Sequence, residues 1–146
     1  MKKELVVQVN NYLANIGVSY IKLHNLHWNV VGMQFKAVHE YLESIYDEFA
    51  DILDEVAEIL KMNDEMPLAS MKDYVKVATI QELNNVDIDV KSAMQIVIDD
   101  MKALKVQALA IRAQADEEDQ FDVANHMEDD VEKYNKIIWF VQSMLK

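Results

Sequence analysis

Residues 35–60 read FKAVHEYLESIYDEFADILDEVAEIL and contain the clearest structural signal in the chain. The apolar side chains recur at every third or fourth position, at Val38, Leu42, Ile45, Phe49, Ile52, Val56 and Leu60. This spacing places them on one stripe of an α-helix and does not fit the alternation of a half-buried strand. The stretch therefore predicts a long amphipathic helix that ends before Pro67, because proline is poorly tolerated inside a helix.

Three further segments show the same spacing. One runs over residues 5–27 and fades near Gly32, and two more cover residues 90–111 and 127–145. The acidic run ADEEDQFD, at 115–122, is expected to open the last helix, where its carboxylates would complement the positive end of the helix dipole. The same acids are also candidates for lining a cation pore.

Four amphipathic helices joined by one long connection predict an all-α four-helix bundle. The connection, at 63–85, contains a further short helix around SMKDYV. Because this long link lies between the second and third helices, these two are expected to be parallel neighbours. Two glycines and one proline disfavour a turn-rich all-β fold, and residues 1–146 are expected to form a single domain.

Composition excludes several kinds of site. The chain has no cysteine, which excludes disulfides, zinc–thiolate sites and thiol chemistry. No apolar run approaches the ~18 residues that a membrane-spanning helix needs, and no secretory leader is evident, so a soluble cytoplasmic protein is expected. The net charge of −12 repels nucleic acid and attracts cations.

Three of the four histidines lie close together in the sequence, at His24, His27 and His39. A ferritin-like di-iron centre inside one bundle uses Glu-x-x-His on two helices. No histidine here has glutamate three residues before it, since those positions hold Ile21, His24, Lys36 and Val123. An ordinary intra-bundle di-iron centre is therefore not expected.

The second helix carries two pairs of metal-ligating residue types at i,i+4 spacing, His39 with Glu43 and Asp54 with Glu58. Glu43 and Asp54 differ by about 20° around the helix axis, but eleven residues separate them by roughly 16 Å. Metal–ligand bonds to nitrogen or oxygen are about 2 Å long, so the two pairs cannot hold one ion within one chain.

A second copy of the chain removes this difficulty. If two copies of the helix pack antiparallel, with a twofold axis near residues 48–49, the His39 end of one copy faces the Asp54 end of the other. Such an interface creates two equivalent sites. His27, at the end of the first helix, could add a nitrogen from the chain that supplies His39.

The sequence resembles the Dps family of bacterial mini-ferritins in HNLHWNVVG (24–32) and FKAVHEYLESIYDEFADILDEVAEIL (35–60). The helix layout, including KIIWF near the end, is similar across essentially the whole chain. The resemblance implies a ferritin-like bundle in a hollow shell of twelve subunits that relieves oxidative stress. It also implies that Fe(II) is oxidised between twofold-related subunits, preferably with hydrogen peroxide, and stored as ferric mineral.

Carried over by position, the resemblance makes His27 and His39 the iron ligands from one subunit. Asp54 and Glu58 become the carboxylates from its partner, with Glu58 bridging two irons of a di-iron centre or binding most firmly. Glu43 departs from the family, which usually has aspartate four residues after the second histidine. Its extra methylene keeps the charge but changes the reach of the carboxylate.

Two other functions stay open at this point. One is a DNA-compacting protective protein with incidental iron binding, although the charge and the few terminal lysines (Lys2, Lys3 and Lys146) make DNA binding unexpected. The other is a structural bundle whose site is degraded by Glu43 or holds zinc.

The remaining residues of interest have ordinary explanations: His24 and Trp28 are expected to pack, and His126 to lie at the surface or near a pore.

Overall fold

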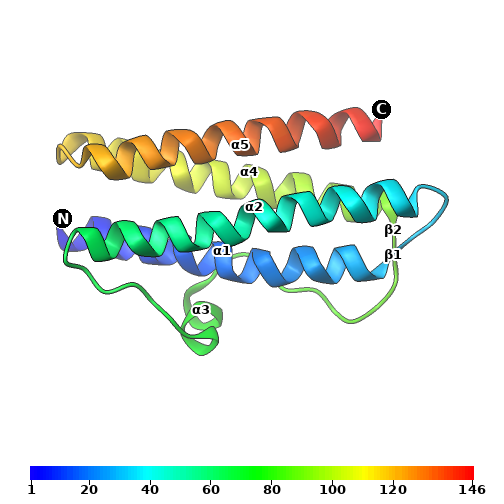
Figure 1. Cartoon of the computed structure of the whole chain (residues 1–146), viewed down its shortest axis with the longest axis horizontal. Coiled ribbons are helices and arrows are strands. Elements are labelled where there is room, and N and C mark those ends of the chain that lie inside the picture. The colour runs from blue at the N-terminus through cyan, green and yellow to red at the C-terminus, as the bar shows by residue number, and fades with distance from the viewer.

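The computed structural model describes all 146 residues and contains five helices and two short strands. Their order is α1 (Lys3–Asn29), β1 (Val30–Val31), α2 (Phe35–Met62), α3 (Met71–Val77), β2 (Ile88–Asp89), α4 (Val90–Glu117) and α5 (Phe121–Leu145). Four long helices run side by side, and α3 stands outside them, next to α1 (Figure 1). The predicted four-helix bundle with one short extra helix is confirmed. None of the helices is both long and apolar enough to cross a lipid bilayer.

One hydrophobic core of 33 buried residues holds the bundle together. Every member of the α2 stripe predicted from the sequence is buried in it, and Ile59 joins them. Burial of each large aliphatic or aromatic side chain contributes about 1.5–3 kcal/mol relative to exposure. The stripe therefore fixes which face of α2 points inward and leaves the opposite face of the helix outside the core.

The helices form a ring in which α1 packs on α2, α4 packs on α5, and the two pairs meet through α1–α4 and α2–α5. The strands β1 and β2 pair in parallel, with Val30 opposite Ile88, so α2 and α4 start at the same end of the bundle. The prediction that α2 and α4 run parallel is confirmed. The prediction that they are neighbours is wrong, because α1 and α5 lie between these diagonal helices.

The long connection after α2 is fastened to α1 by an asparagine and a glycine. The Asn15 carboxamide oxygen accepts hydrogen bonds from the backbone N–H groups of Thr79 and Ile80, at 2.8 and 3.1 Å. At Gly17 a Cβ atom would lie 2.6 Å from the Tyr74 ring, so only glycine lets α3 approach α1 this closely. These contacts hold the crossover on the outer side of α1.

Only the last two residues of the acidic run at 115–122, Phe121 and Asp122, open the last helix, so the prediction is wrong for Asp116–Asp119. The first residues of the run form the final turn of α4, and Asp119 then adopts a left-handed conformation with φ of 56° that ends the helix. Carboxylates near a helix C-terminus oppose the dipole, so they need other partners. Glu118 accepts hydrogen bonds from the Gln114 side chain and the Lys2 backbone N–H, and both lower its pKa.

Candidate metal centre

Two histidines face each other where α1 ends and α2 begins. The His27 Nδ1 lies 2.7 Å from the His39 carbonyl oxygen, and the His39 Nδ1 lies 2.7 Å from the His27 carbonyl oxygen. Their rings stack with centroids 3.6 Å apart and planes inclined by 15°. Because a carbonyl oxygen can only accept, both Nδ1 atoms must donate, which leaves the lone pair of each neutral ring on Nε2. Metal-binding histidines are commonly oriented by such a hydrogen bond from the other ring nitrogen.

Packing fixes this histidine pair further. His27 is only 5% exposed, whereas His39 is half-buried. The Tyr46 ring meets His27 edge-on at a centroid distance of 5.2 Å, and the Phe35 ring lies 4.9 Å from His39. The two rings are thus enclosed by aromatic groups from α2 while His39 retains contact with solvent.

Glu43 lies one turn after His39 on α2 and is held by a neighbouring phenol. The Tyr46 hydroxyl donates a hydrogen bond of 3.2 Å to Glu43 Oε1. Partial removal of the phenol from water, followed by the charge of Glu43, raises the pKa of Tyr46. The hydroxyl therefore remains a protonated donor at neutral pH, and it restricts a carboxylate that has one methylene more than aspartate.

Asp54 and Glu58 lie farther along α2 with exposed side chains. They are not brought to the histidines within one chain, because fifteen residues of helix separate His39 from Asp54 by about 22 Å. The five predicted ligands thus form two groups, one at each end of the exposed face of α2. A group of three or more potential ligands does occur within the chain, but it consists of Glu55, His126 and Asp130.

The structure places His24 and Trp28 beside this centre. The His24 ring stacks on Tyr46 at 3.7 Å, and its Nδ1 lies 2.7 Å from the Tyr20 carbonyl oxygen. These contacts support the expected packing role of His24. Trp28 differs from expectation, since its side chain is 65% exposed and is not part of the core of the chain.

His126 is a residue whose surroundings the sequence did not predict. Its side chain is 11% exposed and lies between Asp130 of α5 and Glu55 of α2. The expectation of an ordinary surface histidine is therefore wrong, whereas a position near a pore of an assembly stays a prediction. The i,i+4 spacing of His126 and Asp130 was a usable signal, but Glu55 is distant in sequence and only the fold brings it close.

The sequence matches the Ferritin-like domain family over residues 6–146. It is 33% identical over 140 residues to antigen TpF1 of Treponema pallidum, covering 95% of this chain and 78% of that protein. The crystal structure of a Dps protein from Bacillus brevis superimposes with a TM-score of 0.95 at 29% identity, covering 100% of both chains. The chain belongs to the Dps family.

A Dps protein from Vibrio cholerae is similarly close, with a TM-score of 0.94 and 31% identity over 99% of this chain and 90% of that one. It is described as a member of a broad superfamily of ferritin-like diiron-carboxylate proteins. Membership of the Dps family supports an iron-storage or DNA-protection role and iron binding for this chain. Imidazole and carboxylate donors, the residue types gathered on α1 and α2, suit that metal.

Proposed function

We propose that this Dps-family protein is a ferroxidase that oxidises Fe(II), preferably with hydrogen peroxide, and stores the ferric product inside a hollow homo-oligomeric shell. The observation that carries this proposal is the reciprocal hydrogen bonding of His27 and His39. It leaves the Nε2 lone pair of each imidazole available to a metal ion where α1 ends and α2 begins. These two histidines supply only part of the proposed ligand set. The carboxylates of Asp54 and Glu58 must therefore come from another chain.

The proposed source of those carboxylates is a second copy of α2. Asp54 and Glu58 lie on the exposed face of the helix, roughly 16 Å along the axis from Glu43. Antiparallel pairing about a twofold axis near residues 48–49 brings them to the histidines of the other copy, in two equivalent sites. Between the two polar ends this face carries half-buried apolar side chains suited to helix contact, namely Tyr46, Ala50, Leu53 and Ala57.

The proposed reaction follows from the donor set. Imidazole and carboxylate ligands hold Fe(II) as substrate and leave coordination positions for an oxidant. Two Fe(II) ions give one electron each to hydrogen peroxide, its O–O bond breaks, and two protons are taken up to form two waters. Oxidation in pairs avoids the one-electron step that releases hydroxyl radical. Glu43, Asp54 and Glu58 neutralise part of the ferric charge.

The strongly acidic surface supports storage of iron more than contact with DNA. A net charge of −12 per chain raises the local concentration of cations and repels the phosphate backbone. We propose that Glu40, Asp47, Glu48 and Asp51, all exposed on α2, supply carboxylates for mineral nucleation in a shell of twelve subunits.

Anaerobic titration of the iron-free protein with Fe(II) tests the proposed function. We expect tight binding to saturate at two or more irons for each pair of chains, one or more per site. Added hydrogen peroxide should then be consumed at one molecule for two irons, without hydroxyl radical in a spin-trapping assay. Weak, unsaturable Fe(II) binding, or radical release equal to that of free Fe(II), would contradict the proposal.

The Tyr46–Glu43 hydrogen bond makes a separate prediction. In Tyr46→Phe the ring still stacks on His24, but Glu43 loses its orienting donor. Outer-shell partners of this kind are worth about 10–100-fold in metal affinity, so we expect at least about tenfold weaker binding of one class of Fe(II). Tyr41→Phe is the matched control, because the Tyr41 ring stacks on Phe140 of α5 instead. Equal effects of the two substitutions would show that Glu43 needs no such support.

A further inference from the structure

A second group of metal-ligating side chains lies between α2 and α5, within one chain. His126 and Asp130 occupy i,i+4 positions on α5, and Glu55 reaches them from α2. The distance from His126 Nε2 to Asp130 Oδ2 is 2.9 Å, and that from His126 Nδ1 to Glu55 Oε2 is 3.7 Å. One potential ligand atom from each of the three side chains lies within 4.8 Å of the other two.

The Asp130 carboxylate is buried and only partly satisfied. Its side chain has 0% exposure, and its Oδ2 accepts a 2.7 Å hydrogen bond from the Tyr12 hydroxyl. Its Oδ1 is also buried and has no hydrogen-bond partner. Tyr12 and Tyr134 also hydrogen-bond to each other. A buried carboxylate of this kind is costly unless a cation compensates it.

The geometry between His126 and Asp130 differs from that of a hydrogen bond. Although Nε2 and Oδ2 are 2.9 Å apart, the buried Nε2 makes no hydrogen bond, because the ring N–H direction does not point at the oxygen. Two ligands bound at about 2.1 Å to one ion, at right angles, lie about 3.0 Å apart and point at the ion rather than at each other. The separation and misalignment observed here match that arrangement.

We propose that Glu55, His126 and Asp130 bind one divalent first-row transition-metal ion inside each chain. One imidazole and two carboxylates suit Zn(II), Co(II), Mn(II) or Fe(II), whereas Mg(II) and Ca(II) prefer oxygen donors alone. The Glu55 side chain is 47% exposed, so it can rotate to close the remaining gap. The site needs no second copy of the chain, in contrast to the proposed ferroxidase site.

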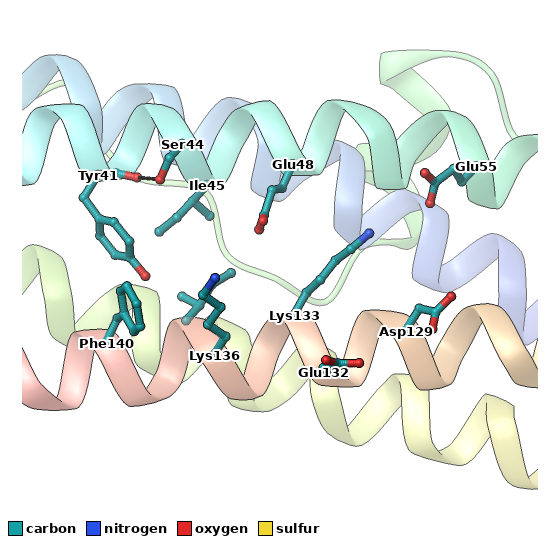
Figure 2. A pocket seen from close by; sticks show the side chains of 11 residues that line it. Tyr41, Ser44, Ile45, Glu48, Glu55, Asp129, Glu132, Lys133, Lys136 and Phe140 are labelled. Atoms are coloured by element: carbon teal, nitrogen blue, oxygen red, sulfur yellow. Dashed lines mark hydrogen bonds between the residues drawn. The ribbon is translucent and has the colours of Figure 1, made fainter.

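A groove on the surface of the bundle is lined by one member of this group, Glu55. It lies between α2 and α5 and has a volume of about 750 Å³. Glu55 and Asp129 lie at one end of it, on opposite helices (Figure 2). The groove wall also carries Glu48 and Glu132 together with Lys133 and Lys136, so its four carboxylates outnumber its two ammonium groups and the groove as a whole favours cations.

The test uses full-length, iron-free protein in which the proposed ferroxidase site is disabled by His39→Ala and Glu58→Gln. Calorimetric titration with Zn(II) is expected to give one site per chain in this background. Titration with Co(II) should give visible absorption bands typical of nitrogen and oxygen ligation. Adding Glu55→Gln or His126→Gln is expected to weaken Zn(II) binding by at least about tenfold and to remove the Co(II) bands.

Glu82→Gln is the matched control, because Glu82 is an exposed glutamate in the connection before β2, outside α2 and α5. It removes the same charge and should leave Zn(II) affinity unchanged. Glu55→Gln changes a half-exposed side chain, so the bundle should fold, and circular dichroism checks this. If the background protein binds no Zn(II), or if all variants bind it equally, the group is a buried ion pair only and the proposal is overturned.

Discussion

Mixing His39→Ala chains with Asp54→Ala chains is expected to restore iron oxidation that neither variant has alone. Removal of an outer-shell partner costs about 10–100-fold in activity, so loss of a direct ligand should lower peroxide-driven oxidation by more than about 100-fold. In the proposed twofold arrangement, each site takes His39 from one chain and Asp54 from the other. A mixed pair therefore contains one site with both ligands intact and one site that lacks both.

The size of the recovery is a quantitative test of this arrangement. Random assembly of equal amounts places one chain of each variant at half of the interfaces. Each such interface has one intact site of two, so about a quarter of all sites should be intact. Oxidation after co-refolding, followed by ferric absorbance, should reach about a quarter of the wild-type rate. Each variant refolded alone is the control. Absence of recovery in properly assembled mixtures would contradict the proposed twofold arrangement.

The second large effect is expected at a buried ion pair between α1 and α4. Lys22 Nζ lies 2.7 Å from Asp100 Oδ2, and the two side chains are only 6% and 18% exposed. Removing one partner of such a pair leaves an uncompensated charge, which typically costs 3–5 kcal/mol. We expect Lys22→Ala to lower the free energy of unfolding by about 3 kcal/mol, measured by chemical denaturation at fixed protein concentration.

Lowering the pH should reduce the loss of stability caused by Lys22→Ala. Desolvation raises the pKa of Asp100, although Lys22 lowers it in part. A carboxyl group whose folded pKa exceeds its unfolded value binds more protons when folded, so stability increases as pH falls between those two values. Loss of Lys22 should widen the pH range between the folded and unfolded pKa values of Asp100. The difference in free energy of unfolding between variant and wild type should therefore shrink as the pH falls through that range.

Two comparisons make the Lys22 result interpretable. Arg112→Ala breaks an ion pair with Glu128 whose side chains are 42% and 51% exposed, and such pairs are worth about 0–1 kcal/mol. The double substitution Lys22→Met with Asp100→Leu removes both charges and should recover most of the lost stability. If Lys22→Ala costs no more than Arg112→Ala, the Lys22 pair is solvated in solution.

The fold was predictable because apolar residues recur at every third or fourth position along each of the four long helices. The stripe of α2, from Val38 to Leu60, fixes both the helix and its buried face. The spacing of His39, Glu43, Asp54 and Glu58 likewise places these side chains on α2 by helix geometry alone. These inferences succeed because they need only positions within one helix.

The remaining features depend on contacts between helices or on single backbone angles. The boundary between α4 and α5 was misplaced because acidic residues are compatible with either side of a turn, and the left-handed angle of Asp119 has no periodic signature. The proximity of Glu55 to His126 arises from the packing of α2 on α5. The two-residue strands β1 and β2 are too short for any alternation to appear.

In the proposed ferroxidase site, the reciprocal hydrogen bonds of His27 and His39 would help to set the affinity for iron. Each ring is fixed by the main chain of the other residue, so both are ordered when the polypeptide folds, and little rotational freedom is lost when an ion arrives. That order depends on the tight corner at 30–34, which sets how α1 enters α2. A change in the backbone of this corner, without any change of ligand, should therefore alter the affinity for iron.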